Sequence, residues 1–214
     1  NFNPILKKKK NKKIIFYGDI YGEIKNKKIT KISVSKIFEK IFLSKNLDKL
    51  IDTLDGRFII IFENNGKIIV RSDKFSRYDL FYSCEKNKNL ISNNFNIIFK
   101  LTENLKINQL AISHMVNVLG TKPPKKDTLF TGIKRLGVNE SIVIKNNLII
   151  VKRRFIPQKT EDYKYDKIEE YYSIFSNYLE NMSKNKKTIF MSSGYDSSFF
   201  ASVSSRVFGK KNVS

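Results

Sequence analysis

The most informative stretch of the chain reads Lys186-Lys187-Thr188-Ile189-Phe190-Met191-Ser192-Ser193-Gly194-Tyr195-Asp196-Ser197-Ser198. Its pattern predicts an apolar strand over 187–191, a tight turn of small and hydroxyl residues, and a helix over 197–208. At such a junction the unpaired backbone N–H groups and the positive end of the helix dipole point at one spot. The stretch therefore indicates a binding site for a phosphate chain.

The predicted cofactor-binding residues are those of the turn and its flanks: Met191, Ser192, Ser193, Gly194, Tyr195, Asp196 and Ser197. Serine hydroxyls can donate hydrogen bonds to phosphate oxygens, and Gly194 lets the backbone come close to an anion. Asp196 would repel phosphates unless a cation lay between them, so we expect it to bind Mg²⁺. The structural alternative is a strand–turn–helix unit in which Ser and Asp only cap the helix.

Composition sets the broad class of the protein. The chain has 214 residues, enough for one large domain or for one domain and part of another. The single cysteine, Cys84, excludes an intramolecular disulfide, and the single histidine, His114, excludes a multi-histidine metal site. No apolar run is long enough to span a membrane and no targeting signal is visible, so we expect a cytoplasmic protein with no membrane partner.

The formal net charge of +21 raises the question of nucleic-acid binding. Lys, Asn and Ile are all over-used, which fits an AT-rich coding sequence as well as it fits a phosphate-binding surface. The lysines are scattered except for the run Lys7–Lys13, and arginine, the better reader of bases, is sparse. We therefore interpret the charge as a solvated basic face and do not expect nucleic acid to be the partner.

Residues 1–157 read as a strand-rich first domain. Three hairpins are predicted, over 58–62 with 67–71, over 80–83 with 89–92, and over 141–144 with 148–151. Apolar residues at helical spacing predict helices over 36–43, 48–54 and 107–119. Strands that pair as hairpins and are flanked by helices indicate a layered α+β domain.

Residues 158–214 read as the start of a second domain. The segment 157–167 is polar and is interpreted as the linker, and a helix over 168–182 carries an aromatic stripe expected to be a packing face. The strand, turn and helix around Gly194 then form the opening β–α unit of an α/β domain with a parallel sheet. Both ends of the chain look cut, since it starts at Asn1 and stops just after this unit.

The turn also resembles a known signature. Ser192-Ser193-Gly194-Tyr195-Asp196-Ser197 is similar to the Ser-Gly-Gly-x-Asp-Ser loop of the PP-loop ATP pyrophosphatases, with Ser193 in place of the first glycine. In that superfamily the loop grips the β,γ-pyrophosphate of ATP, which leaves with Mg²⁺. The resemblance implies ATP and Mg²⁺ as cofactors.

Motifs of the first domain resemble those of glutamine-hydrolysing asparagine synthetases. They are Leu54-Asp55-Gly56-Arg57-Phe58, the segment Ser72–Tyr82, and Thr128-Leu129-Phe130-x-Gly132-Ile133-x-x-Leu136. They occur in the family's order and are followed by the PP-loop motif. The resemblance implies a class II (Ntn) glutamine amidotransferase-like domain with α/β/β/α layers.

That family's glutaminase uses an N-terminal cysteine, and its apparatus is missing or altered here. Asn1 is no nucleophile, so no catalytic residue is expected in the chain, and Cys84 is expected to be inert. Tyr17 stands in the place of the family's oxyanion-binding Asn. Lys36 stands in place of the Asp that helps to hold glutamine, and this charge reversal would weaken recognition of the substrate's ammonium group. Either a cysteine lies upstream of Asn1 in a divergent glutaminase, or the domain keeps the fold without the activity.

The resemblance implies an enzyme: an ATP-dependent amide-forming ligase that activates a carboxylate as an acyl-adenylate, releasing pyrophosphate and then AMP. Its partners would be a small carboxylate substrate and glutamine or ammonia as nitrogen donor, and a homodimer is compatible with the sequence. The alternative is a non-catalytic scaffold, a pseudo-amidotransferase with a vestigial phosphate loop. A basic nucleic-acid binder is the third hypothesis.

Overall fold

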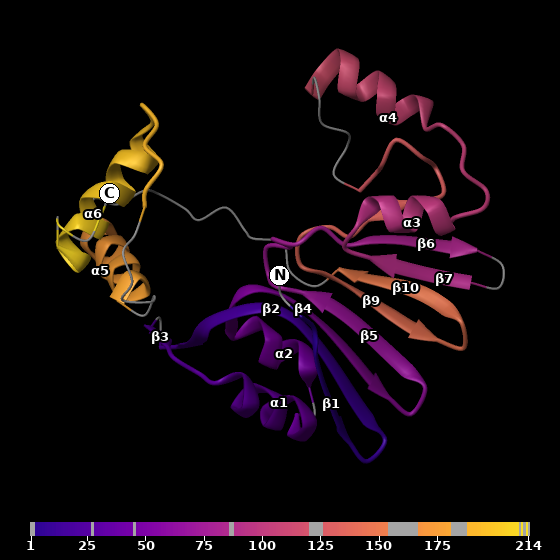
Figure 1. Ribbon diagram of the computed structural model, residues 1–214, viewed down its shortest axis with the longest axis horizontal. Helices are drawn as coiled ribbons and strands as arrows, with labels where there is room; N and C mark the ends of the chain where they lie inside the picture. Colours follow the sequence, from indigo (N-terminus) through magenta and orange to yellow (C-terminus); the bar gives the residue numbers. More distant parts are fainter. Residues whose placement is uncertain are drawn as a thin grey trace.

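Two antiparallel sheets with helices on their outer faces form the body of the protein (Figure 1). The computed structural model describes residues 3–26, 28–44, 46–85, 88–119, 126–153, 167–180 and 188–209, with Lys211 and Val213. The main sheet has the strand order β1 (Ile5–Lys9), β2 (Lys12–Lys25), β4 (Leu54–Asn64), β5 (Lys67–Ser72), β9 (Glu140–Lys145) and β10 (Leu148–Arg153), and β3 (Lys28–Thr30) pairs with β2. The second sheet has the order β7 (Lys88–Ser92), β6 (Phe81–Glu85) and β8 (Lys134–Arg135).

Alternation along the strands builds a core on each face of the main sheet. Phe58 and Ile60 on β4 pack against α1 (Val34–Leu43) and α2 (Leu47–Asp52). Ile59, between them, packs instead with Leu80 and Leu136 on the opposite face. Because successive side chains of a strand point to opposite faces, a continuous apolar run such as 58–62 is what a strand covered on both sides requires.

The outermost layer is α3 (Phe95–Leu101), which packs on the second sheet. Leu80 and Tyr82 belong to the core beneath the main sheet, whereas the Phe81 ring lies 5.3 Å from the Phe95 ring of α3. The layers are therefore α1–α2, main sheet, second sheet and α3. The layered α+β arrangement predicted for the first domain is confirmed.

All three predicted hairpins are confirmed, as β4–β5, β6–β7 and β9–β10. The helix predicted over 48–54 ends at Asp52, because Leu54 already pairs in β4. The helix predicted over 107–119 begins at Gln109 as α4 (Gln109–His114) and continues as a π-helix, Met115–Leu119. Sequence patterns missed β1, β2, β3, β8 and α3.

Helices α5 (Lys167–Glu180) and α6 (Tyr195–Phe208) form a pair beside the sheets (Figure 1). The aromatic stripe is a packing face, as predicted, with the Phe175 ring 5.5 Å from Phe199 and 5.4 Å from Phe200. The far end of α5 contacts the main sheet, where Asn177 Oδ1 accepts from the Ile29 N–H at 3.1 Å. Of the predicted linker, 157–166 lies outside the described residues and Lys167 already belongs to α5. No helix in the described part of the chain is long and apolar enough to cross a membrane.

A buried arginine ties α2 to the sheets. Arg71 on β5 is 1% exposed, and its Nη1 lies 3.0 Å from Asp48 Oδ1 on α2. Its Nη2 pairs with Asp52 and donates to Asn139 Oδ1 at 3.0 Å. A charge that is out of water must be paired and hydrogen-bonded, so this cluster fixes α2 against the sheet.

We expect Arg71→Leu to lower the free energy of unfolding by about 3 kcal/mol, at the lower end of the range for broken buried pairs because both aspartates are partly exposed. Denaturant titration measures the effect. The matched control is Lys13→Leu, which removes a half-exposed pair with Glu63 at 3.9 Å and should cost less than about 1 kcal/mol. Equal losses in the two variants would contradict the role of Arg71.

A second buried pair joins α1 to β2. Glu23 is 6% exposed, and Lys40 Nζ lies 2.5 Å and Lys25 Nζ 3.1 Å from its carboxylate. Burial alone would raise the pKa of Glu23, but the hydrogen bonds and charges of the two lysines outweigh it and lower this pKa below 4.5. A carboxyl whose pKa falls on folding stabilises the folded state at neutral pH.

The stabilisation from Glu23 should be complete above pH 4.5 and disappear as the pH falls through the lowered pKa. Glu23→Gln should therefore be less stable than the wild type at neutral pH, and the difference should shrink below pH 4.5. Unfolding curves over a pH series measure it. Glu63→Gln, at an exposed pair, is the control, and a difference for Glu23→Gln that grows toward acid pH would refute the assignment.

Candidate functional site

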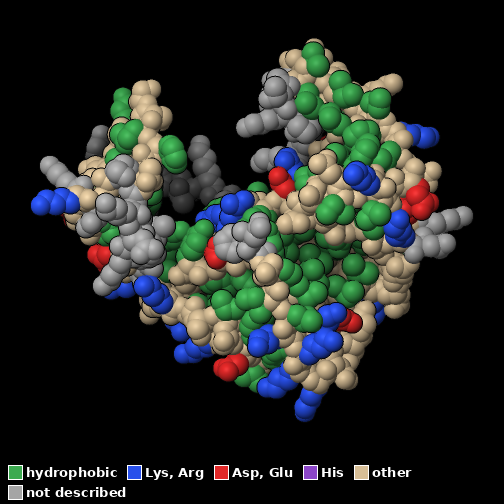
Figure 2. Space-filling model, in the orientation of Figure 1, with side chains coloured by type: hydrophobic (Ala, Val, Ile, Leu, Met, Phe, Trp, Pro, Cys, Tyr) green, Lys and Arg blue, Asp and Glu red, His purple; other side chains and the backbone are tan. Residues whose placement is uncertain are grey.

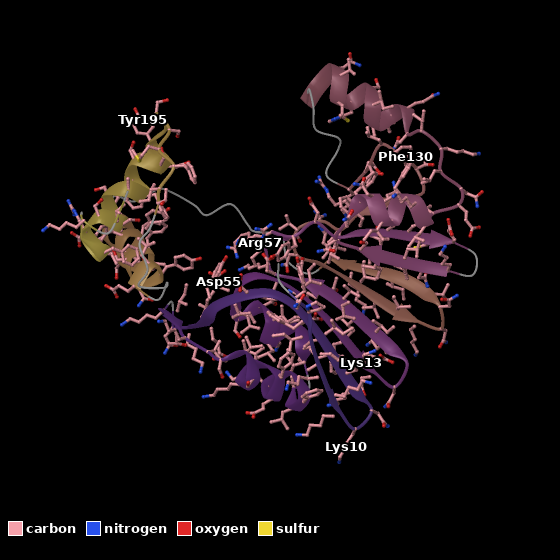
Figure 3. All side chains as sticks on the ribbon, viewed as in Figure 1. Lys10, Lys13, Asp55, Arg57, Phe130 and Tyr195 are labelled. Carbon is pink, nitrogen blue, oxygen red and sulfur yellow. The ribbon has the colours of Figure 1, made fainter. Side chains whose placement is uncertain are left out.

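The predicted phosphate loop lies at the start of α6, facing solvent. Gly194 is the N-cap residue, with φ −80° and ψ 149°, and no side chain caps the helix. The first N–H groups of a helix, here those of Tyr195, Asp196 and Ser197, have no acceptor within the helix. Tyr195 is 96% exposed and stands at the outer end of α6 (Figure 3). The positive end of this helix is therefore open to an anion.

Hydroxyl groups hold the loop in shape. The Ser192 N–H donates to Ser197 Oγ at 3.1 Å, and the two Oγ atoms are 2.9 Å apart. The Gly194 N–H donates to Ser192 Oγ at 3.2 Å, and the Ser197 hydroxyl is 2.9 Å from the Gly194 carbonyl oxygen. The structure thus brings the predicted loop residues together. It also engages both hydroxyls that were expected to hold phosphate.

The strand predicted over 187–191 is wrong for the residues described. Residues 188–191 form no strand, and Phe190 and Met191 are 91% and 60% exposed. A strand needs a neighbour to complete its backbone hydrogen bonds, and no strand of the described ranges lies beside this segment. The helix predicted over 197–208 is confirmed and begins two residues earlier, at Tyr195. The role of the Met191 backbone toward adenosine stays a prediction.

Asp196, the predicted metal ligand, is exposed in the first turn of α6. Its position next to the free N–H groups suits a cation held between the carboxylate and a phosphate. No group of three or more His, Cys, Asp or Glu residues that could hold a metal ion occurs in the described part of the chain.

A second cluster of side chains surrounds Tyr17, the residue in the place of the family's oxyanion-binding Asn. We call Tyr17, Tyr78 and Arg57 the Tyr17 cluster. The Tyr17 ring is 5.1 Å from the Tyr78 ring, and the Arg57 guanidinium lies over Tyr78 at 4.2 Å. Desolvation raises the pKa of Tyr78, although the charge of Arg57 opposes the shift. An Asn amide at position 17 would offer two N–H donors to an oxyanion, whereas Tyr17 offers one hydroxyl on a packed ring.

The structure does not bring Tyr17 and Lys36 together. Tyr17 packs on the face of the main sheet that also holds Ile59 and Leu80. Lys36 is exposed on α1, which covers the opposite face. Lys36, in the place of the Asp that helps to hold glutamine, therefore lies apart from the Tyr17 cluster.

Sequence patterns assigned no role to Arg77, which lies in the segment Ser72–Tyr82 and joins it to the motif Leu54–Phe58. Arg77 Nη1 lies 3.0 Å from Asp55 Oδ1 and 3.8 Å from Asp73 Oδ1 (Asp55 is labelled in Figure 3). Burial raises the pKa of Asp73, although the N–H groups of Phe75 and Arg77 donate to its carboxylate. Asp55 and Asp73 both lie in the quoted motifs, but the partner that links them shows only in three dimensions.

Helix α5 contacts β2 through Tyr178. Its ring meets the Tyr21 ring edge-on at 6.0 Å. Burial, with the charge of Asp55, raises the pKa of Tyr178 to about 12. This tyrosine therefore stays protonated at neutral pH, and its ring packs against Tyr21.

Neither Cys84 nor His114, the two remaining candidate residues, is placed for catalysis. Partial desolvation raises the pKa of the Cys84 thiol, which disfavours the reactive thiolate. His114 is half-buried at the end of α4, and its Nδ1 has no hydrogen-bond partner in the described part of the structure. Neither residue lies in the loop or in the Tyr17 cluster.

The likeness of this chain to known proteins is distant and structural. No protein-family model matches the chain, and no curated protein matches it in sequence. Among solved structures, the chain is similar to glutamine phosphoribosylpyrophosphate (PRPP) amidotransferase from B. subtilis, complexed with ADP and GMP, at 11% identity and a TM-score of 0.41. The match covers 97% of this chain and 47% of that one, so the chain spans about half its length. The asparagine synthetase resemblance stays a prediction from the motifs.

Gly18, beside Tyr17, permits the close approach of β2 to β4. Its φ is +107°, and a Cβ there would lie 2.2 Å from the Arg57 carbonyl oxygen. We expect Gly18→Ala to lower the free energy of unfolding by about 3 kcal/mol through backbone strain and this clash. Gly132→Ala is the control, because its nearest neighbour would be 3.3 Å away. Chemical denaturation measures the stability of both variants. A Gly18→Ala protein as stable as the control would show that the close approach of β2 to β4 does not require a glycine.

Proposed function

We propose that this chain carries the nucleotide-binding start of an ATP-dependent amide-forming ligase. The observation that carries the proposal is the uncapped, solvent-facing N-terminus of α6, preceded by the turn Ser192-Ser193-Gly194. Free N–H groups and the helix dipole at such a point favour a multiply charged phosphate. The sequence of the turn selects a triphosphate, by its likeness to the PP-loop signature.

In the proposed reaction a substrate carboxylate attacks the α-phosphate of ATP, and pyrophosphate leaves. An amine then displaces AMP from the acyl-adenylate. Such catalysis depends mainly on orientation and on neutralising charge. The N–H groups of Ser193, Gly194 and Tyr195 would hold the β- and γ-phosphates. The Gly194 N–H, now bonded to Ser192 Oγ at 3.2 Å, would exchange this acceptor for a phosphate oxygen.

Asp196 fits a bridging magnesium ion, because its carboxylate is exposed at the first turn of α6. When bound, Mg²⁺ would offset the charge that develops on the leaving pyrophosphate. Ser192 and Ser197 would orient the loop through their shared hydrogen bonds, which are 2.9–3.1 Å long. A loop already held in shape loses less conformational entropy when it binds.

A non-catalytic scaffold is the second candidate. It is favoured by the same hydroxyl bonds, because they satisfy the loop without any ligand. The packed Tyr17 ring in the predicted oxyanion position favours it too. In this case the loop would be vestigial and the layered domain would serve a partner protein.

Calorimetric titration of the full-length protein with ATP, with and without Mg²⁺, separates the two functions. The ligase predicts Mg²⁺-dependent binding and at least a tenfold loss of affinity in Asp196→Asn, because one ligand charge is removed. Glu103→Gln, which removes an exposed charge on the first domain, should bind as the wild type does. ATP–pyrophosphate exchange should be abolished in Asp196→Ala.

The absence of any heat with Mg-ATP would support the scaffold and refute the ligase. Binding that is unchanged in Asp196→Asn would refute the metal role of this carboxylate. Circular dichroism of each variant checks that the fold is intact.

A further inference from the structure

Three hairpins of the main sheet turn at the same end of the sheet (Figure 1). The turns are at Lys10-Asn11 between β1 and β2, Asn65-Gly66 between β4 and β5, and Asn146-Asn147 between β9 and β10. All six turn residues are polar, basic or glycine. Figure 3 shows Lys10 at the tip of the first hairpin and Lys13 further along the sheet.

Strand register gathers lysines that are far apart in the sequence into one row at this end. Lys9 pairs with Lys12, Lys12 with Asn64, and Asn64 with Lys67. Lys145 follows next to Lys67, one step beyond the pair Ile68–Ile144. Paired residues share a face, so Lys9, Lys12, Lys67 and Lys145, which we call the lysine row, lie on the side of the sheet that α1 covers. Across five strands spaced about 4.8 Å apart, the row spans about 19 Å.

The charges at this end are poorly compensated. Lys8 lies directly opposite Lys13, and Lys9 directly opposite Lys12, and like charges in such positions are destabilising. Lys13 has a distant partner in Glu63 at 3.9 Å, and Lys12 Nζ donates to the Phe42 carbonyl oxygen at 2.6 Å. Lys8 and Lys9 have no anionic partner among the described residues. A bound polyanion would relieve this repulsion.

A cavity of about 440 Å³ opens beside the row. We call it the hairpin pocket, and it is lined by Lys9, Lys10, Asn11, Lys12, Phe42, Leu43, Asn64 and Asn65. The lining has no acidic side chain, three lysines and three asparagines, and the end of α1 provides an apolar wall. Such a lining suits a ligand that combines anionic groups, hydrogen-bonding edges and an apolar surface.

The two ends of the main sheet differ in charge. The end away from the turns carries both signs, with Asp19, Glu23 and Asp55 beside Lys25, Lys28 and Arg57. The turn end is more uniformly basic, and Glu63 beside Lys13 is acidic. Figure 2 shows Lys and Arg side chains, with some Asp and Glu among them, along the lower rim of the molecule.

We propose that the lysine row and the hairpin pocket bind the phosphate backbone of a single-stranded nucleic acid, independently of its sequence. The row would contact successive phosphates, and the pocket would take one unpaired nucleotide, with its base against Phe42. Lysine acts as a point charge without the paired donors that let arginine read guanine, so base preference should be weak. An anionic membrane fits less well, because no apolar residue stands at the three turns to enter a bilayer.

This site lies on the main sheet and shares no residue with the phosphate loop before α6. Its binding is therefore independent of ATP, and either proposal can fail without the other.

The test is fluorescence anisotropy of the full-length protein with labelled oligo-U and oligo-dT, over about 50 to 200 mM salt. The triple variant Lys9→Gln, Lys67→Gln, Lys145→Gln should bind at least tenfold more weakly and reduce the salt slope by about two, because each phosphate contact of a single strand contributes about 0.7. Asn65→Asp, which places a carboxylate in the pocket wall, should also weaken binding. Asn65 has φ 47°, a conformation that aspartate also adopts, so the turn is retained.

The matched control is Lys28→Gln, Lys31→Gln, Lys100→Gln, which removes the same charge from exposed positions outside the row. It should retain wild-type affinity within about twofold, since screening limits distant charges. Equal losses in the two triple variants would reduce the effect to net charge and overturn the proposal. So would the absence of binding at low salt, equal affinity for duplex and single strand, or binding of phosphatidylserine vesicles in place of the oligonucleotides.

Discussion

The pairing of β2 with β4 is the constraint on which the rest of the structure depends. It runs from Lys12 opposite Asn64 to Glu23 opposite Leu54, with one irregularity between Ile20 and Gly22. Every other layer is placed by it, because α1 and α2 cover one face of the pair and the second sheet covers the other. Along this pairing Gly18 and Gly56 leave no room for a Cβ. This pair of strands holds Lys12 of the lysine row at one end, and Tyr17 and Arg57 lie further along it.

Local signals in the sequence were enough for the hairpins and for most helices. The β4–β5 hairpin could be predicted because an apolar run precedes Asn64-Asn65-Gly66, whose φ-permissive residues form the turn. The central strand β2 was missed because lysines and glycines interrupt its alternation, and it becomes a strand only by pairing on both sides. The reverse holds for residues 188–191, whose local pattern is strand-like but which have no neighbouring strand within the described residues.

The position of the candidate site could be predicted from the sequence, but its hydrogen bonds could not. The order Ser-Ser-Gly-Tyr-Asp-Ser places the turn at a helix N-terminus, and the structure puts α6 there. The mutual hydrogen bonds of Ser192 and Ser197 could not be foreseen, because they depend on the loop's three-dimensional path. The relative positions of the other candidate residues depend on how distant strands pair, which the sequence does not show. This pairing separates Tyr17 from Lys36 across the sheet, and it joins Lys9, Lys67 and Lys145, which look scattered along the chain.

The contact of α5 with the main sheet has a mechanical consequence. Asn177 accepts a hydrogen bond from the backbone of β3, and the Tyr178 ring packs against Tyr21 near the carboxylate of Asp55. Helix α5 also packs along α6, with the Phe175 and Phe199 rings 5.5 Å apart, so α6 is connected to the edge of the main sheet through α5. A change in the tilt of α6 on binding an anion would therefore act on β2 and β3 through these contacts.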